Sequence, residues 1–353
     1  MALTAEQLDR LSIALVSMYE AAELAMLERI AHSLASGIAA PDWQLTKLNE
    51  LQLLIGRERR LLADLAGLSS REIADAIMKA YNLGQASAMA STAMAANGPS
   101  AASVASAMRV RALVAEATMG IVGSHGRILR SFEDIYRTVI ADASGVAMLG
   151  VETRRQAAQR ALDRFANQGV VGFTDRLGRQ WEARSYVEMS MRTTIHKASI
   201  QGHVDRLQQR GHDLVIVSDH SQECELCRPW EGKVLSISGI RHVEVRTAGT
   251  LAEAEAAGLF HPGCRHTIGA YFPGVTEAPT RTADPEGDAA RQEQRRLERG
   301  VRAWKRRDAA SLTPEAKRQA HAKAREWAQR LREWEASHDL KHQGFRSSVS
   351  AAR

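Results

Sequence analysis

All three cysteines of the chain fall within residues 218–271, and this clustering constrains the fold more than any other feature. Cys224 and Cys227 form a C-x-x-C pair, and Cys264 follows in the run His-Pro-Gly-Cys-Arg-His. Two residues between thiols let both sulfurs turn towards one point, and three Cys with one His make a tetrahedral zinc set. The pattern therefore predicts a structural zinc site rather than a small buried thiol cluster. The histidines beside these cysteines, any of which could be the fourth ligand, are His220, His261 and His266.

Two catalytic interpretations of residues 218–271 fit the order of the motifs along the chain less well. A base deaminase carries H-x-E before P-C-x-x-C, whereas His242-Val243-Glu244 follows the C-x-x-C here and no Pro precedes Cys224. A thiol–disulfide motif places C-x-x-C at a helix start, but residues 214–217 before it read as a strand and a turn follows it. Four protein ligands would also leave zinc no open position for a catalytic water beside an acid such as Glu231.

Several other function classes lack their motifs in this chain. No G-x-x-x-x-G-K-[ST] pattern is present, which excludes a P-loop packaging motor, and no G-x-S-x-G or H-E-x-x-H stands in a fitting context. No apolar run has the length of a membrane span, and the start MALTAEQLDRL lacks the pattern of a secretory signal. An odd number of cysteines in one cluster is typical of a reducing compartment.

The composite pattern around the cysteines resembles a known family. The succession S-D-H, C-x-x-C-x-x-W-x-G-K, S-x-S-G and H-P-x-C-R-H over residues 218–266 is similar to that of the phage minor capsid proteins of the second type. These proteins are related to the Mu F-like head morphogenesis proteins. The resemblance continues upstream through residues 186–194 and downstream to the basic tail, and covers the N-terminal half by overall character. In such proteins a Cys commonly stands at the position of His266, which implies His266 rather than His261 as the fourth ligand.

The resemblance implies a structural component of the virion and not an enzyme. Such a minor head protein is expected to act near the portal vertex during head assembly and DNA packaging. Its expected partners are the portal protein, the major capsid protein or both, and no membrane. Its expected location is the phage head, with the host cytoplasm as the place of assembly. The alternatives are a capsid-carried enzyme, such as a nuclease or toxin-like domain with a catalytic Cys/His metal centre, and a zinc-stabilised nucleic-acid-binding protein.

The N-terminal half is dominated by amphipathic helical patterns. Thr4-x-x-Gln7 is a capping box, and apolar residues then recur at three- and four-residue spacing as far as Ile30. Aromatic residues make up only 5% of the chain, so stripes of Leu, Met and Ala predict association with other chains. Residues 1–168 are therefore predicted to be a helical attachment or oligomerisation module. Further helices are predicted over residues 43–66, 69–96, 100–122, 131–141 and 153–168.

The pattern changes after this helical half. Phe173 and Trp181 flank a turn-forming Asp-Arg-Leu-Gly and predict a β-hairpin, followed by a helix over residues 185–210. Residues 169–276 are predicted to form a compact α+β domain with the cysteines in its loops. The predicted fold class is mainly α with this smaller α+β domain and charged C-terminal helices. The predicted strands of the domain are residues 214–218, 233–238 and 265–271.

The positive charge of the chain is concentrated in its C-terminal tail. Residues 277–290 read as a linker, and residues 291–353 as a basic helical arm. Residues 291–346 hold 16 Lys and Arg against 8 Asp and Glu, while the whole chain has a net charge of +6. The arm is expected to bind packaged DNA or an acidic protein surface, and its deletion to leave the rest folded. The predicted contacts are Arg295, Arg296, Arg299, Lys305, Arg306 and Arg307.

Overall fold

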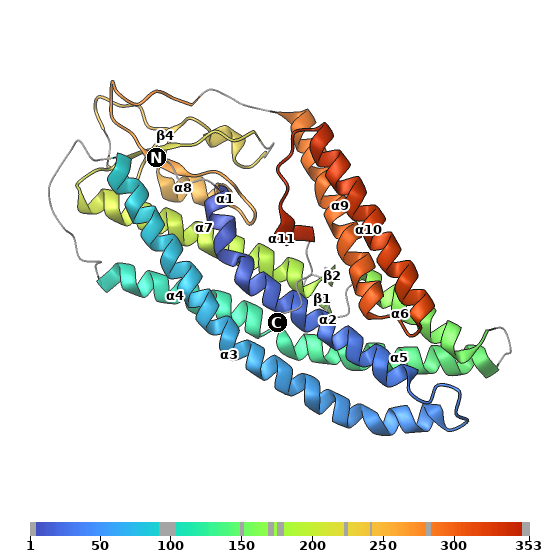
Figure 1. Ribbon diagram of the computed structural model, residues 1–353. Coiled ribbons are helices and arrows are strands. Elements are labelled where there is room, and N and C mark those ends of the chain that lie inside the picture. The colour runs from blue at the N-terminus through green and yellow to red at the C-terminus, as the bar shows by residue number, and fades with distance from the viewer. Residues whose placement is uncertain are drawn as a thin grey trace. The chain divides into compact units, whose positions relative to one another are not determined.

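The computed structural model describes residues 5–91, 104–148, 152–168, 173–174, 180–221, 225–240, 242–279 and 284–347. Within these ranges helices predominate, and three strands form a small antiparallel sheet (Figure 1). The elements in chain order are α1 (Ala5–Asp9), η1 (Arg10–Ser12), α2 (Ile13–Ala35), α3 (Trp43–Ser91), α4 (Val104–Val122), α5 (His125–Met148), α6 (Arg154–Gln168), β1 (Phe173–Thr174), β2 (Gln180–Trp181), α7 (Ala183–Gln209), β3 (Leu214–Val217), η2 (Arg228–Trp230), β4 (Val234–Ser236), α8 (Leu251–Ala256), β5 (Ile268–Ala270), α9 (Pro285–Ala309), α10 (Pro314–Ser337) and α11 (Gly344–Ser347).

The predicted mainly helical fold with a small sheet is confirmed, including the hairpin in which Phe173 pairs with Trp181. Helix α5 is longer than the predicted helix 131–141, and the predicted helices 43–66 and 69–96 form a single α3 of 49 residues. Its interior Gly67 costs only about 1 kcal/mol relative to Ala, and the buried face continues past it through Ser69. Another difference is that α9 begins inside the range predicted as linker, since Pro is well accommodated in a first helical turn. None of the described helices is long and apolar enough to cross a membrane.

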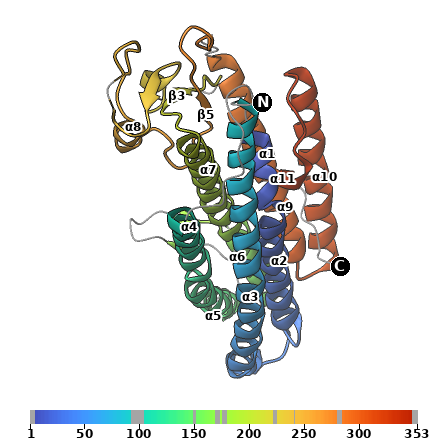
Figure 2. The same cartoon turned by 90° about the vertical axis from the view of Figure 1, so that its left-hand side faces the viewer.

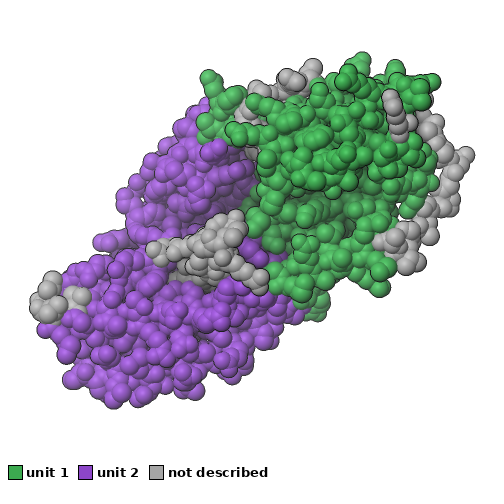
Figure 3. Space-filling model, turned by 180° about the vertical axis from the view of Figure 1, so that it is seen from behind, with its two compact units in different colours: residues 1–14, 70–120, 188–289 green, residues 15–69, 121–187, 290–353 purple. Residues whose placement is uncertain are grey.

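The chain divides into two compact units, each made of three separate segments (Figure 3). Unit 1 comprises Met1–Ala14, Ser70–Gly120 and Glu188–Ala289. Unit 2 comprises Leu15–Ser69, Ile121–Val187 and Ala290–Arg353. This division differs from the contiguous predicted segments, because α3 and α7 each contribute residues to both units. The divisions therefore fall inside helices, where no loop composition marks them.

The sheet of unit 1 supports a single apolar core. Its strand order is β4-β3-β5, and β3 pairs antiparallel with both neighbours. All four residues of β3 are buried, as in a strand covered on both faces. The core also contains Cys227 and Cys264, so these two predicted ligands are anchored in it. Its other members include Ile200, Val204, Leu207, Val215, Val217, Leu235, Leu251, Leu259, Phe260 and Ile268.

Within unit 1 the backbones of α3 and α7 come into direct contact. A Cβ atom on Gly84 would lie 2.0 Å from a backbone oxygen of α7, and one on Gly202 would lie 2.1 Å from the backbone oxygen of Tyr81. Both positions therefore require glycine. The buried carboxylate of Asp205 fixes this contact, because it accepts hydrogen bonds from Tyr81 Oη at 2.8 Å and Arg109 Nη2 at 2.6 Å.

Unit 2 is a set of helices joined by polar contacts as well as apolar packing. Tyr19 of α2 meets His125 Nε2 of α5 at 2.6 Å. The indole of Trp43, only 1% exposed, donates to the backbone oxygen of Leu34 at 3.0 Å and closes the turn between α2 and α3. Its buried apolar side chains include Leu15, Val16, Met26, Leu27, Ile30, Leu51, Leu62, Phe132, Tyr136 and Val139.

A cluster of buried charges lies in the interior of unit 2. Glu20 and Glu23 of α2 are 4% and 3% exposed. Glu20 pairs with the buried Arg184 of α7. Arg306 of α9 lies 4.0 Å from Glu23 and donates a hydrogen bond to Glu182 at 2.9 Å. These ion pairs link α2 with α7 and α9, and removal of one partner would leave a charge buried without compensation.

The C-terminal helices α9 and α10 lie side by side in Figures 1 and 2. Their contact is tight because Gly300 faces the indole of Trp327, where a Cβ atom would come within 2.1 Å of the ring. Trp334 adds a hydrogen bond from Nε1 to the backbone oxygen of Ala290 at 3.0 Å. The apolar residues of this seam are Leu297, Val301 and Leu331, with Trp327, Ala328 and Trp334 packed against them.

Two Gly→Ala changes in α3 should have opposite effects on stability. Gly84→Ala places a Cβ atom against the backbone of α7 and should lower the free energy of unfolding by about 1–3 kcal/mol, as overpacking does. Gly67→Ala meets no atom within 4 Å and should raise it by up to about 1 kcal/mol through helix propensity. Urea denaturation followed by circular dichroism measures both, and equal effects would contradict the close contact.

The buried carboxyl of Glu20 should make stability depend on pH. Burial raises the pKa of Glu20 from 4.5 to about 7, against the lowering effect of Arg184 and Arg302. The contribution of Glu20 to the free energy of unfolding is therefore complete below its unfolded pKa and is lost as the pH rises through the folded value. Glu20→Gln cannot ionise, so its stability should fall less than that of the wild type between about pH 5 and about pH 8.

Urea denaturation at the two pH values measures this difference. Glu28→Gln alters an exposed residue of the same helix and should retain the wild-type pH dependence. An unchanged pH dependence in Glu20→Gln would show that the buried carboxyl is not its source.

Candidate metal centre

Three chain segments converge at one end of the unit 1 sheet. In the antiparallel register Val217, the last residue of β3, pairs with Ile268, the first residue of β5. Val234, the first residue of β4, pairs with Ile216. The chain leaving β3 and the chains entering β4 and β5 therefore meet at the same end. These segments carry His220, Cys227, and Cys264 with His266, respectively.

The segment before β4 holds Cys227 in a fixed turn. Cys227 is the N-cap residue of η2, and its backbone oxygen accepts a hydrogen bond from Trp230 N at 2.9 Å. Gly232 then returns the chain to the sheet by donating to the backbone oxygen of Val217 at 3.1 Å. Its φ of +66° lies in the left-handed region that favours glycine. The thiol of Cys227 is thereby fully buried.

The segment before β5 is a second tight turn. Cys264 N donates to the backbone oxygen of His261 at 2.9 Å. Phe260, immediately before this turn, has a φ of 61°, which costs a residue with a Cβ atom about 1–2 kcal/mol. Burial of its ring and an edge-on contact with His196, at a centroid distance of 5.4 Å, offset this strain. Such strained positions are often found where side chains are held for a function.

The two turns bring metal-ligand atoms together. The ligand atoms of Cys227, His261 and Cys264 all lie within 4.8 Å of one another. The two sulfur atoms are 3.4 Å apart, close to the separation of about 3.8 Å that Zn–S bonds of about 2.3 Å give in a tetrahedron. This Cys-His-Cys group could hold a metal ion. Cys224, the other cysteine of the C-x-x-C pair, lies outside the described residues.

His266 is held from both sides of its ring. Its Nδ1 lies 3.5 Å from Cys264 Sγ, and its Nε2 lies 2.7 Å from Glu231 Oε1. His266 is 2% exposed. A histidine that binds metal through one nitrogen commonly has a carboxylate on the other. The ring of His220 lies 6.0 Å from that of His266 between centroids.

The two candidate histidines are supported by different observations. The three-residue group whose ligand atoms all lie within 4.8 Å of one another contains His261 and not His266. Burial and the Glu231 carboxylate favour His266, whereas His261 is half-buried and its Nδ1 lies 3.0 Å from the backbone oxygen of Pro262. Burial and the carboxylate contact fix the orientation of the His266 ring.

The electrostatics of the centre favour thiolate. A hydrogen bond with Cys227 is the main cause that lowers the pKa of Cys264 to about 3, with His266 adding to it and burial opposing it. Burial lowers the pKa of His266, but hydrogen bonds with Cys264 and Glu231 outweigh this and raise it. Thiolate is the form in which cysteine binds metal.

Two residues of the centre have roles that the sequence does not reveal. Glu231 is acidic and near the cysteines in sequence, but only the structure shows that it bonds to His266. His196, on α7, lies 2.6 Å through its Nε2 from the backbone oxygen of His266. Burial lowers the pKa of His196. Seventy residues separate this pair, and no spacing pattern connects them.

The predicted anion contacts of the C-terminal helices differ in their surroundings. Arg306 is 3% exposed and donates to the backbone oxygen of Ala166 at 2.7 Å as well as to Glu182. Its prediction as a surface contact is wrong, because buried acceptors occupy its guanidinium. Lys305 is half-buried and donates to the backbone oxygen of Ser347 at 2.6 Å.

The remaining predicted contacts lie nearer the surface. Arg296 is exposed and bonds to Glu293 at 2.6 Å, and Arg307 lies 4.2 Å from the ring centre of Trp304. Arg295 is half-buried, and Arg299 is exposed. Deletion of the tail would remove the arginine beside the buried Glu23, and this contact argues against the expectation that the rest of the chain stays folded without it.

Comparison with known proteins assigns the family. The family model for phage minor capsid protein 2 matches residues 3–336. The chain belongs to this family. Among curated proteins, "Structural protein" of Lactococcus phage LL-H is 25% identical over 188 residues, which cover 50% of each protein. The chain therefore spans about half the length of that relative. No solved structure matches the chain.

The family membership confirms the resemblance noted in the sequence. This minor capsid protein is a structural component of the phage head. The description of the family as a minor capsid protein and of the relative as a structural protein points away from an enzyme.

Substitutions at the centre of this minor capsid protein should release metal in a graded order. Cys264→Ser should abolish retention of about one metal ion per chain, and Glu231→Gln should lower affinity by about 10- to 100-fold. His266→Ala should lose more metal than His261→Ala. Metal analysis after gel filtration measures retention, and His242→Ala serves as the control because its ring bonds to Asp213 instead. Metal-free wild-type protein with freely titrating thiols would contradict the metal centre.

Proposed function

We propose that this minor capsid protein acts near the portal vertex during head assembly and DNA packaging. The observation that carries the proposal is the family match over residues 3–336. Its partners are then other virion proteins, with the portal protein and the major capsid protein as the expected ones. It assembles in the host cytoplasm and is retained in the virion.

Exposed apolar side chains on the helices support a role in attachment. Leu53 and Met78 of α3 are 72% and 49% exposed, and Met108 and Met119 of α4 are 65% and 73% exposed. Met108 and Met119 are three turns apart on one face of α4, and exposed apolar groups that share a face are typical of surfaces that bind other proteins. We assign this role to the helices of residues 1–168, as an attachment or oligomerisation module.

A structural zinc ion is the cofactor that best fits the donor set. Thiolate and imidazole donors suit zinc, whereas calcium and magnesium take oxygen ligands. We propose Cys224, Cys227, Cys264 and His266 as the ligands, with His261 and His220 as alternatives to His266. The ion would join the turn before β4 to the turn before β5. Since both turns adjoin the apolar core, it would stabilise residues 169–276 as a domain.

The enzyme alternative differs from this proposal in metal coordination. A catalytic zinc keeps a position for water, and a structural zinc has four protein ligands. Glu231 is hydrogen-bonded to His266 and therefore acts as a support for the imidazole. X-ray absorption of the zinc-loaded protein distinguishes the two, because a bound water would replace one of the four protein donors.

The C-terminal helices retain a smaller candidate surface for anions than the sequence predicts. Arg296 and Arg299 are exposed on α9, and Arg307 is partly exposed beside Trp304. These side chains would meet packaged DNA or an acidic protein surface in residues 291–353. Arg306 and Lys305 form hydrogen bonds inside unit 2. They therefore contribute to the stability of unit 2 and are not part of this surface.

A head protein of this kind should be present in purified particles. Quantitative mass spectrometry of purified heads should find the chain at a copy number close to that of the portal protein and far below that of the major capsid protein. Heads assembled without this chain are the control. Its absence from purified heads would contradict the proposed function, and a copy number equal to that of the major capsid protein would contradict a position near the portal.

A further inference from the structure

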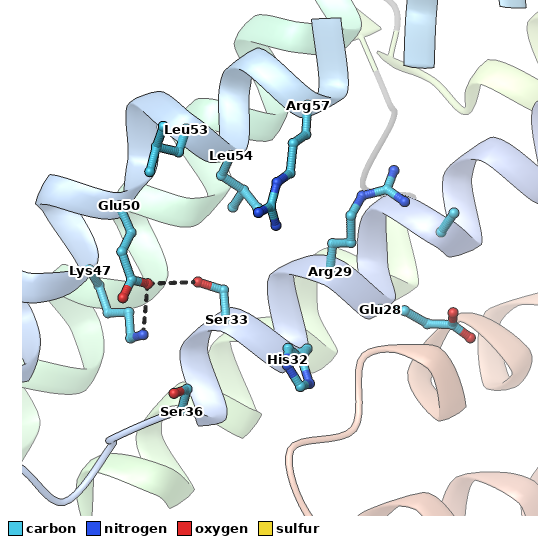
Figure 4. A pocket seen from close by; sticks show the side chains of 11 residues that line it. Glu28, Arg29, His32, Ser33, Ser36, Lys47, Glu50, Leu53, Leu54 and Arg57 are labelled. Carbon is cyan, nitrogen blue, oxygen red and sulfur yellow. Dashed lines mark hydrogen bonds and ion pairs between the residues drawn. The ribbon is translucent and has the colours of Figure 1, made fainter. Parts of the chain in front are cut away.

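A groove runs between α2 and α3 in unit 2, separate from the metal centre. Its volume is about 460 Å³. The side chains that line it come from both helices, and Figure 4 shows Ser33 of α2 facing Glu50 of α3 across the gap. The lining residues are Ala25, Glu28, Arg29, His32, Ser33, Ser36, Lys47, Glu50, Leu53, Leu54 and Arg57.

The spacing of the lining residues shows that the groove follows the helices. On each helix they recur every three or four residues, which is the spacing of one helical face. The lining stretch of α2 spans residues 25–36, which at 1.5 Å per residue is about 16 Å long. A groove of this length and shape accommodates about three turns of another helix.

Two of the cations in the groove are neutralised by neighbouring acids. Arg29 donates through Nε and Nη2 to the fully buried carboxylate of Glu58, the second bond at 2.7 Å. Lys47 bonds to Glu50 at 2.8 Å, and the hydroxyl of Ser33 lies 3.4 Å from the same carboxylate. The carboxylates of Glu50 and Glu58 are thus already paired, whereas Glu28, which also lines the groove, forms no ion pair among the described residues.

Other groups in the groove are available to a ligand. Within the described part of the chain, the side chains of Arg57 and His32 make no hydrogen bond or ion pair. Figure 4 shows Arg57 reaching from α3 towards α2, while the carboxylate of Glu28 points away from it. Leu53, one helical turn before Arg57 on the same face of α3, is 72% exposed. An unpaired guanidinium therefore stands beside an exposed apolar side chain.

We propose that this groove binds an acidic amphipathic helix of another virion protein. A Glu or Asp of that helix would pair with Arg57, with His32 as a second donor, and an apolar residue one turn away would cover Leu53. Charge complementarity selects an acidic ligand. The exposed Leu53 favours a protein ligand over a nucleic acid, because a nucleic-acid backbone offers phosphates but no aliphatic group to cover the leucine. This inference rests on the proposed function in one respect: the partner helix is expected in another protein of the phage head.

Binding to designed peptides tests the groove with the full-length protein. The probes are a helical peptide with Glu and Leu one turn apart on one face, the same peptide with Gln in place of Glu, inorganic phosphate and a short DNA duplex. Isothermal calorimetry should show binding of the Glu peptide and at least about tenfold weaker binding of the Gln peptide. Arg57→Glu should weaken the Glu peptide by at least about tenfold, and Leu53→Ala should weaken it less.

Matched variants separate this groove from general charge effects. Arg59→Glu reverses an exposed charge of α3 that does not line the groove, and it should bind the Glu peptide like the wild type. Circular dichroism should show all three variants equally folded, because each residue is exposed. Equal binding of the Glu and Gln peptides would overturn the proposal. Tighter binding of phosphate or duplex than of the Glu peptide, or a loss of self-association in Arg57→Glu, would also overturn it.

The outcome of the peptide-binding experiment does not depend on the metal centre or on the proposed position near the portal. If heads lack this chain but the Glu peptide binds through Arg57, the proposed function fails and the groove stands. If heads contain the chain but the peptide does not bind, the groove fails alone.

Discussion

The contact between Cys227 and Cys264 is the interaction on which the organisation of unit 1 depends. Their sulfur atoms are 3.4 Å apart although the residues are separated by 37 positions in the chain. Antiparallel pairing of β3 with both neighbours is what brings the two turns to one end of the sheet. A bond between these turns would link the chain segments that enter β4 and β5 at the end of the sheet where they meet. A metal ion is the cross-link that these donors suit, because thiolate binding converts metal affinity into folding free energy.

A second constraint acts through buried charge in unit 2. Isolated carboxylates cannot be placed in a protein interior without partners, and Glu20 and Glu23 obtain theirs from other helices. This requirement links the C-terminal helix α9 to α2, because Arg306 of α9 is a cation beside the buried carboxylate of Glu23 on α2. A tail with a strong basic excess is therefore partly structural. The charge count of a segment does not show how many of its cations reach the surface.

The elements that could be predicted from the sequence are those with local determinants. The hairpin follows from a turn sequence, and each strand of the sheet is a short apolar run beside glycine or proline. The division into two units could not be predicted, since its boundaries fall inside helices. The approach of α3 to α7 at Gly84 and Gly202 could not be predicted either, because these residues are more than one hundred positions apart. For the same reason the cysteines of the centre were found by spacing, whereas the contact of His196 with His266 was not.

The pattern of paired and unpaired cations separates structural from binding roles in this protein. Arg29, Arg184 and Arg306 each form an ion pair with a carboxylate that is itself mostly buried, so these arginines stabilise the fold. Arg57 is exposed and has no such partner among the described residues, yet it lies within the same groove as Arg29. An unpaired cation costs little where water solvates it, and it gains most when a ligand carboxylate reaches it in a recessed, partly apolar site. Recognition of a partner in the proposed groove would therefore depend less on the net charge of +6 than on the few arginines that the fold leaves uncompensated.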